Sequence, residues 1–531
     1  MIKHSVLLVL ISLLISCSSA PKTNIESYKG KLPDDKGIVI AEVYSNSHYI
    51  PGSTSGWNEL VFIDIDAEEQ QLYTIKQIQQ SKSRSTFAGL LPVGRYGLAV
   101  LSYVDHSDAS ATNVKVSLPQ SLGIFEVRPQ GITDLGTILY HAMKTQHFLD
   151  STLSSYAVSR EENPHLLKQI KQTYPKIFAN VQPEQATLHW NRDNFNSART
   201  SAKDMILAAE LPVNLIKSNK HYYLPTKYGN LITARNNNWD LINTGLTRQI
   251  DQLVEVDNSK VLVADELQQL YLIETQNSAE QPTPKKIETE TVIALKRVAD
   301  LPIVVTHIPE QQLKIYSFQN NTLSLMTSFE YAGFLAKVEE DTPTVYFGKD
   351  TVSINVEGNM VHFNVAKSTW AQSLSPNYHK VYRLDNNYLV AAEASQWTQV
   401  KNITLSTDNG TNWNNTPIDG NYEVYFDKGK NLYYIEQGFK TSFDAPPEIL
   451  KRVPFYTSKD KGLTVEAISK LPEMCDKFMP AVSEINNFLV LCTNGDIYRS
   501  QDQGKNWGIF YQRNTVDMKK FPKILFTSMT P

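Results

Sequence analysis

Two eight-residue segments place an acidic side chain where it could either transfer protons or hold a tight turn. One runs from Ser406 to Trp413 and the other from Ser500 to Trp507, and both read S-x-D-x-G-x-N-W. A carboxylate two residues before a glycine can accept hydrogen bonds from backbone N–H groups that a hairpin turn exposes. The glycine can adopt positive φ, and the tryptophan brings a large apolar face to the next strand. The pattern therefore predicts stabilised turns and no catalytic residue.

This pattern resembles the Asp-box, which marks the β-propellers of sialidases, sortilin-type receptors and photosystem assembly factors. The resemblance identifies a propeller superfamily without a specific family, and it leaves activity open. It implies structural roles for Ser406, Asp408, Gly410, Trp413, Ser500, Asp502, Gly504 and Trp507.

Weaker copies extend the repeat over residues 221–531. A glycine followed by Asn or Asp precedes three of the relevant tryptophans, at Gly229, Gly358 and Gly495. The tryptophans at 239, 370, 413 and 507 are spaced by multiples of about 44 residues, which is within the range of propeller blades. We expect about seven blades, with six or eight remaining open, and silent copies near 283, 326 and 460. Ring closure would bring residues 524–526 beside strands near Tyr222.

The N-terminus predicts secretion and lipid anchoring. Residues 1–16 have a short basic start and an apolar run that is too short to span a bilayer, as in a signal peptide. Leu14-Ile15-Ser16-Cys17 resembles the lipobox of bacterial lipoproteins, which implies that Cys17 is acylated, for example by palmitate. Ser18, in place of Asp, implies sorting to the outer membrane, facing the periplasm or the cell surface. An ordinary signal peptide with a chance cysteine is the alternative.

The remaining segments predict a mainly β protein. Residues 17–36 are polar and lack periodicity, as in a tether. Residues 37–140 contain short strand-like runs and predict a β-sandwich, whose turn at Leu91–Tyr96 resembles that of transthyretin-like or immunoglobulin-like domains. Residues 141–220 predict a short helical connector, with helices after Asn163-Pro164 and over 198–210. The fold class is thus a sandwich, a connector and a C-terminal propeller.

Composition narrows the functional classes. The chain has 51 basic and 55 acidic residues, so a nucleic-acid partner is not expected. Cys475 and Cys492 could form a disulfide or remain a thiol pair, since thiols outside the cytoplasm tend to be oxidised. No zinc-protease, nucleophile-elbow, P-loop or dinucleotide motif occurs, and the histidines have no ligand spacing. We therefore expect no cofactor and no metal.

Three functional hypotheses follow. The first is a non-enzymatic outer-membrane lipoprotein whose propeller binds or scaffolds a protein or glycan. The second is a sialidase-like glycoside hydrolase; that resemblance implies an arginine triad, a Tyr–Glu pair and an acid, yet the usual (F/Y)-R-I-P motif is absent. The third is a component of an envelope assembly or secretion complex. The predicted propeller contains seven arginines from which the triad of a sialidase could be formed: Arg235, Arg248, Arg297, Arg383, Arg452, Arg499 and Arg513.

Overall fold

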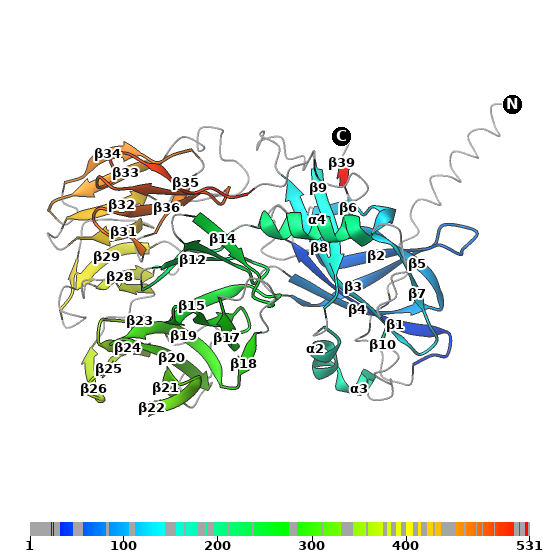
Figure 1. The fold of residues 1–531 in the computed structure, drawn as a ribbon, viewed down its shortest axis with the longest axis horizontal. Helices are drawn as coiled ribbons and strands as arrows, with labels where there is room; N and C mark the ends of the chain where they lie inside the picture. The colour runs from blue at the N-terminus through cyan, green and yellow to red at the C-terminus, as the bar shows by residue number, and fades with distance from the viewer. Residues whose placement is uncertain are drawn as a thin grey trace. The chain divides into compact units, whose positions relative to one another are not determined.

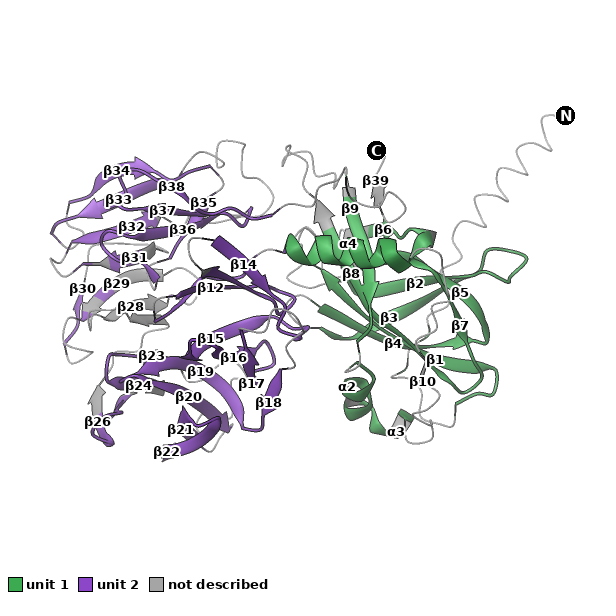
Figure 2. Cartoon of the chain, viewed as in Figure 1, with its two compact units in different colours: residues 1–209, 515–531 green, residues 210–514 purple. Residues whose placement is uncertain are grey.

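The chain separates into two compact units, residues 1–209 with 515–531 and residues 210–514 (Figure 2). No helix in the described part of the chain is long and apolar enough to cross a membrane. Cys17, Asp408 and Gly410 lie outside the described residues. The computed structural model describes residues 23, 25, 32–45, 57–80, 84–105, 112–143, 155–163, 166–178, 186–187, 196–210, 212–219, 221–235, 238–275, 284–308, 312–330, 344–356, 359–374, 380–383, 389–394, 400–406, 412–415, 422–427, 431–436, 453–460, 464–473, 475–479, 482–492, 494–514, 520 and 526–528.

The first unit is built on an eleven-stranded sheet within the described residues (Figure 1). Its strands follow the order β39-β9-β8-β1-β4-β3-β2-β5-β6, while β10 pairs with β8 and β7 pairs with β5. Their bounds are β1 Lys36–Ser45, β2 Glu59–Asp64, β3 Leu72–Gln80, β4 Arg84–Pro92, β5 Gly94–Asp105, β6 Thr112–Ser117, β7 Ile124–Val127, β8 Ile132–Met143, β9 Ser155–Glu161, β10 Ala186–Thr187 and β39 Phe526–Ser528.

Strand β3 joins two parts of this sheet. Its residues 72–76 pair with β2, whereas residues 77–80 pair with β4. Val39 of β1 belongs to the same buried cluster as Phe62 of β2 and Tyr96 of β5, although β4 and β3 separate β1 from these two adjacent strands in the sheet order. The sheet therefore curves around a single core, as in packings where one strand passes between layers. The sequence predicts a sandwich confined to 37–140, whereas the observed sheet also recruits β9 and β39.

A second apolar cluster covers the outer face of β1 and β4. Ile40 of β1 packs there with Leu166 of a short helix. Ile25 and Leu32 belong to the same cluster and are 0% and 8% exposed. The prediction of a free tether over 17–36 is wrong for these two residues, because their aliphatic side chains bury between the sheet and the helices.

Residues 141–220 contain strands as well as the expected helices. The helices are α2 Leu166–Thr173, α3 Pro175–Phe178 and α4 Asn196–Ala208, and η1 Gln120–Leu122 is a 3-10 turn earlier in the unit. Strand β9 pairs with β8 and places Tyr156 and Val158 in the main core. The helical-connector prediction is therefore wrong for β9, whose alternating apolar residues complete a sheet formed by distant strands.

The second unit contains seven four-stranded antiparallel sheets within the described residues, each formed by consecutive strands. This succession is a β-propeller fold. Sheets one to three are β11 Ile216–Ser218, β12 His221–Pro225, β13 Leu231–Arg235 and β14 Asn238–Ile242; β15 Ile250–Asp257, β16 Lys260–Asp265, β17 Leu270–Glu274 and β18 Lys285–Ile287; β19 Thr291–Val298, β20 Leu301–Ile308, β21 Gln312–Gln319 and β22 Thr322–Glu330. Sheets four to seven are β23 Thr344–Phe347, β24 Thr351–Val356, β25 Asn359–Asn364 and β26 Thr369–Leu374; β27 Lys380–Arg383, β28 Leu389–Ala394, β29 Val400–Ser406 and β30 Asn414–Asn415; β31 Tyr422–Phe426, β32 Leu432–Glu436, β33 Pro454–Ser458 and β34 Glu466–Lys470; β35 Cys475–Phe478, β36 Phe488–Cys492, β37 Ile497–Ser500 and β38 Gly508–Tyr511.

Tryptophans near the start of fourth strands join neighbouring sheets. The indole N–H of Trp370 in sheet four donates to Thr327 Oγ1 in sheet three at 3.0 Å. The indole N–H of Trp239 in sheet one donates to the carbonyl oxygen of Phe510 in sheet seven at 3.0 Å. The first and last sheets also share a buried apolar cluster. Side-chain packing between two complete sheets therefore closes the ring.

The C-terminal strand β39 pairs with β9 of the first unit, antiparallel, over three residue pairs. The sequence predicts that residues 524–526 join strands near Tyr222; this prediction is wrong for Phe526, and residues 524 and 525 lie outside the described residues. Sheets one and seven already have four strands each, so ring closure leaves no place for the tail there.

Candidate functional site

Each propeller sheet has two ends with different connections. We term one end the connection face; it carries the links between sheets and the turns between second and third strands. The other, the hairpin face, carries the turns between first and second strands and between third and fourth strands. Because consecutive strands are antiparallel, a link and the following second-to-third turn lie at the same end of a sheet.

The Asp-box residues of sheet seven form a closed hydrogen-bond network on the hairpin face. The hydroxyl of Ser500 donates to Asp502 Oδ1 at 2.8 Å. Asn506 donates its backbone N–H to Asp502 Oδ1 at 2.9 Å and its amide to Oδ2 at 2.7 Å. Hydrogen bonding by the Asn506 backbone is the main cause that lowers the pKa of Asp502 to about 2. This carboxylate stays ionised at neutral pH and stabilises the turn by accepting these hydrogen bonds.

Gly504 and Trp507 attach the same turn to sheet six. Gly504 has φ +87°, and its N–H donates to Ser500 Oγ at 2.8 Å. A Cβ at Gly504 would lie 2.3 Å from Cε1 of Phe455. The Trp507 ring meets Phe455 edge-on at 5.3 Å between centroids, and its N–H donates to Ser469 Oγ at 3.2 Å. All five fixed positions of the motif in this copy therefore have structural contacts.

The other copy is described only in part. Ser406 is fully buried at the end of β29, and Trp413 directly precedes β30. These are the places in sheet five that Ser500 and Trp507 occupy in sheet seven.

The sequence predicts a silent copy near 460, and sheet six contains a third such turn there, whose motif the sequence analysis missed. The hydroxyl of Ser458 donates to Asp460 Oδ1 at 2.8 Å. Thr464 donates its N–H to Oδ1 at 2.7 Å and its hydroxyl to Oδ2 at 2.6 Å. The hydroxyl of Thr464 is the main cause that lowers the pKa of Asp460 to about 2. The local sequence reads S-x-D-x-G-x-T-V, so Thr replaces Asn and Val465 replaces the tryptophan.

Two of the three glycines noted before the third strands have backbone roles, and the third, Gly358, lies outside the described residues. Gly229 and Gly495 adopt φ +87° and +89° in the turns between second and third strands. A Cβ at Gly229 would lie 2.5 Å from the carbonyl oxygen of Arg248. In sheet seven, Cys475 and Cys492 face each other on β35 and β36, and a disulfide joins them.

A polar cluster on the connection face of sheet three is the strongest candidate for recognition. Glu290, in the link before β19, accepts hydrogen bonds from Lys314 Nζ at 2.5 Å and from the Tyr316 hydroxyl at 3.0 Å. The hydroxyls of Thr306 and Thr289 each lie 3.2 Å from the same carboxylate. The side chains of Glu290 and Lys314 are 26% and 22% exposed. We call Glu290, Thr306, Lys314 and Tyr316 the Glu290 cluster.

The electrostatics of this cluster favour fixed charges. Burial alone would raise the pKa of Glu290, but the hydrogen bonds from Lys314 and Tyr316 outweigh it and lower the pKa to about 2. The hydrogen bond to Glu290 raises the pKa of Lys314. At neutral pH the cluster is therefore an ion pair flanked by hydroxyls, able to offer donors and an acceptor without exchanging protons.

A buried lysine lies on the connection face of sheet one. Lys227, in the turn after β12, is 5% exposed, and burial lowers its pKa to about 8 against the opposing influence of Glu210 and Glu266. Glu210 accepts the backbone N–H of Tyr228 at 2.7 Å. The turn is thus wrapped around a buried carboxylate, which fixes its shape.

The hairpin face carries a different carboxylate between sheets one and two. Glu255 of β15 is 2% exposed and lies 2.6 Å from His221 Nδ1 and 2.5 Å from the Tyr223 hydroxyl. Arg297 of sheet three donates to the carbonyl oxygens of Glu255 and Val256 at 2.8 and 2.9 Å. These contacts join β12, β15 and β19, which belong to sheets one, two and three.

The described arginines are spread over both ends and the outer strands of the propeller. Arg297 donates hydrogen bonds at the hairpin face, whereas Arg248 lies in a link on the connection face. Arg499 lies over the Phe510 ring at 5.1 Å on the outer strands. The side chains of Arg235 and Arg383 and all of Arg452 lie outside the described residues. The described arginines therefore do not form the triad that a sialidase resemblance implies.

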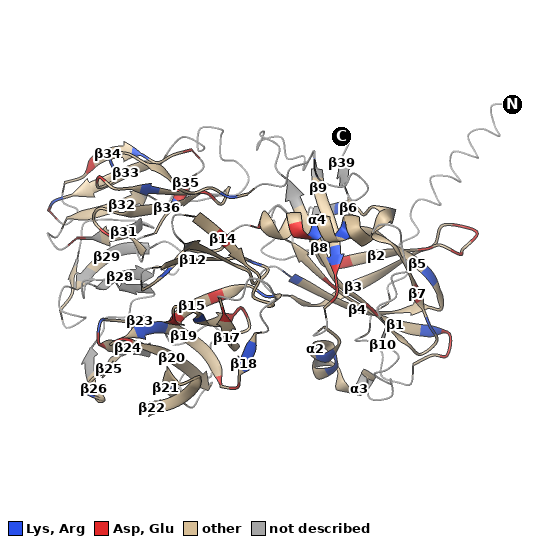
Figure 3. Cartoon of the chain, viewed as in Figure 1, with Lys and Arg blue, Asp and Glu red and all other residues tan. Residues whose placement is uncertain are grey.

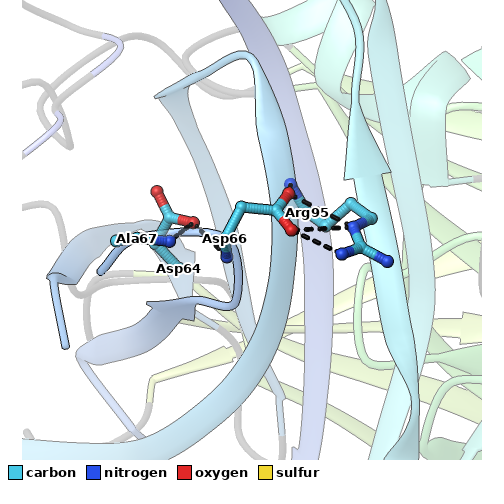
Figure 4. Close-up of polar contacts among 4 residues, drawn as sticks. All are labelled: Asp64, Asp66, Ala67 and Arg95. Atoms are coloured by element: carbon cyan, nitrogen blue, oxygen red, sulfur yellow. Dashed lines mark hydrogen bonds and ion pairs between the residues drawn. The ribbon is translucent and has the colours of Figure 1, made fainter. Parts of the chain in front are cut away.

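In the first unit, ion pairing fixes the turn at Leu91–Tyr96. Arg95 Nε donates to Asp66 Oδ1 at 3.0 Å and Oδ2 at 3.2 Å (Figure 4). The backbone N–H of Asp66 in turn donates to Asp64 Oδ1 at 2.9 Å. The hydrogen bond from Arg95 lowers the pKa of Asp66. Both partners are about half exposed, so the pair aligns two hairpins without contributing much stability.

Charged residues of both signs are distributed over strands of both units (Figure 3). Within the described residues, no three His, Cys, Asp or Glu side chains group as metal ligands would.

Comparison with known proteins gives likenesses of fold among solved structures. No protein-family model and no curated protein matches the sequence. The β-propeller domain of the Trilobed protease from Pyrococcus furiosus is 12% identical, with 57% of this chain and 99% of that chain covered and a TM-score of 0.38. The WD40 domain of SCAP from fission yeast is 9% identical, with coverages of 56% and 86% and a TM-score of 0.34. The computationally designed Ika8 protein is 9% identical, with coverages of 58% and 89% and a TM-score of 0.39.

Proposed function

We propose that the chain is a lipid-anchored protein of the bacterial outer membrane, whose seven-bladed propeller is a non-enzymatic binding or scaffold module for a protein or glycan. Acylation of Cys17 would fasten the protein to the membrane, facing the periplasm or the cell surface. The curved β-sheet unit, sandwich-like in its two layers, would lie between anchor and propeller along the chain.

The Glu290 cluster carries the binding part of this proposal. A general acid or base works best when its pKa lies near the operating pH. Glu290, with a pKa of about 2, is far from that range. Its carboxylate, in the link before β19, instead forms a fixed set of hydrogen-bonding groups with the Lys314 ammonium and the Tyr316 hydroxyl of β21. Such a set suits recognition of polar groups on a partner.

Cross-linking in intact cells, followed by purification of the full-length protein from membranes, tests this function. The E290Q/K314M variant should lose partners that the native protein retains. E466Q/K470M, which removes an exposed acid and an exposed base from β34, is the matched control and should retain them. Equal recovery with both variants would place recognition elsewhere.

Anchoring is tested separately by metabolic labelling with an alkynyl palmitate analogue. The native protein should incorporate the label and sediment with outer membranes, whereas C17S should lose the label and become soluble. Membrane retention of an unlabelled C17S protein would contradict the lipid anchor.

A sialidase-like hydrolase is the second candidate, because the Tyr316 hydroxyl lies 3.0 Å from a Glu290 carboxylate oxygen, as a Tyr–Glu pair would. Burial raises the pKa of Tyr316, which disfavours the phenolate needed for attack. Release of methylumbelliferone from a fluorogenic sialoside, lost in Y316F, would establish this alternative. The third candidate, a component of an envelope assembly, predicts that the cross-linked partners are subunits of one stable complex.

A further inference from the structure

The chain after Cys17 is fastened to the first unit within a few residues. Thr23 donates its backbone N–H and its hydroxyl to the carbonyl oxygen of Thr74 on β3, at 3.0 and 3.2 Å. Ile25 is then fully buried. Gly89 of β4 permits this approach, because a Cβ there would lie 2.6 Å from the Thr23 carbonyl oxygen. An extended chain spans at most ~3.6 Å per residue, so Cys17 lies within roughly 20 Å of Thr23.

Helix α2 lies on the face where this attachment occurs. Leu166 and Ile170 of α2 pack in the same cluster as Ile25. The amide of Gln169 donates to Gln79 Oε1 on β3 at 3.1 Å, which fixes the helix beside that strand. Thr74 and Gln79 are five residues apart on β3, about 17 Å at ~3.3 Å per residue. The reach of the acylated cysteine therefore extends to α2.

The outward side of α2 is basic. Its sequence, LLKQIKQT, contains two lysines and no acidic residue. Lys168 is exposed and Lys171 is half-buried. Together with Leu167 and Gln172 they line an open hollow of about 380 Å³. Two ammonium groups at the rim of a hollow match the phosphate of a lipid headgroup in charge and hydrogen bonding.

We propose that Lys168 and Lys171 of α2 dock the first unit onto the phosphates of anionic phospholipids in the membrane that holds Cys17. The proposal rests on the proposed lipid anchor. The short segment between Cys17 and Thr23 keeps α2 close to the lipid headgroups. Two weak charge contacts are therefore enough to hold α2 there, whereas a protein without the anchor would dissociate. The anchor would then hold the sheet in one orientation on the bilayer.

Coupling the protein chemically to vesicles tests docking independently of acylation in the cell. Cys17 is the reactive thiol of the mature chain, because the other two of its three cysteines form the disulfide. The mature protein is attached to maleimide lipids in vesicles of phosphatidylcholine, with or without phosphatidylglycerol. Hydrogen exchange over residues 166–173 is the readout. We expect slower exchange with phosphatidylglycerol, and 0.5 M salt should remove the difference in the native sequence.

Substitutions then assign the effect to α2. K168Q/K171Q should weaken docking about thirty-fold, at ~1 kcal/mol per lysine, and make exchange equal on both vesicles. K285Q/K286Q, which removes two exposed lysines from β18 of the propeller, should leave the difference intact. Inserting about twenty Gly/Ser residues between Cys17 and Thr23 should reduce it, because effective concentration falls with linker length.

Two results would overturn the proposal: equal exchange of α2 on both vesicles, or equal effects of the two double-lysine variants. Neither outcome bears on acylation, which the labelling of C17S tests. Conversely, failure of Cys17 to be acylated in cells would remove the membrane from the proposal even if the coupled protein docks.

Discussion

Replacement of Gly504 by alanine tests whether the Asp-box turn is a structural link between sheets. The positive φ of +87° costs a residue with a Cβ about 1–2 kcal/mol. The new Cβ would also lie 2.3 Å from Phe455 Cε1, and forcing a methyl group into such a packed contact costs about 1–3 kcal/mol. We therefore expect G504A to lose about 2–5 kcal/mol of unfolding free energy.

Gly508 provides the matched control because a Cβ there would meet nothing within 4 Å. G508A should be neutral or stabilising by up to about 1 kcal/mol. Urea unfolding followed by tryptophan fluorescence measures both variants, since Trp507 lies in the affected turn. The melting temperature of G504A should fall by about 3–8 °C. Equal unfolding midpoints for the two variants would refute the structural role of this turn.

Three further perturbations have defined outcomes. W239F removes the indole donor to Phe510 at the ring closure and should cost about 1–2 kcal/mol in urea unfolding, whereas an unchanged midpoint would mean that other contacts close the ring. Reducing the Cys475–Cys492 disulfide should cost about 3 kcal/mol of unfolding free energy for a loop of this length. Dithiothreitol should therefore lower the unfolding midpoint of the native protein, whereas it should not change the midpoint of C475S/C492S. Because the pKa of Glu290 falls from 4.5 unfolded to about 2 folded, its stabilising effect should be full above pH 4.5 and decline toward pH 2. The E290Q variant should lack that part of the pH dependence, and parallel pH curves would contradict the assignment.

The repetitive features of the propeller were accessible from sequence because they depend on local geometry. Asp502 bonds within its own turn, and Gly495 and Gly504 have positive φ in short loops. The Asp460 turn carried the same S-x-D-x-G signal, but Thr464 and Val465 replace the residues that made the other copies visible.

Features that depend on residues far apart in the chain could not be predicted from the sequence. β9 becomes a strand because β8 and β39 lie on its two sides, and no local pattern specifies those partners. Ile25 is a single aliphatic residue in a polar stretch, and its burial requires the cluster with α2. In the Glu290 cluster, the alternation of Lys314 and Tyr316 places both on one side of β21, but the carboxylate comes from a separate link.

The path of the chain yields one more prediction. The propeller, residues 210–514, lies in sequence between α4 and β39, so the first unit is completed only after the propeller has been made. Ring closure uses Trp239 and Phe510, both within 210–514. Truncation after residue 514 should therefore leave the propeller folded while uncovering the edge of β9 at residues 155–157. Proteolysis of the truncated protein should then cut the first unit faster and spare the propeller. Loss of propeller protection would instead show that the tail takes part in holding the ring closed.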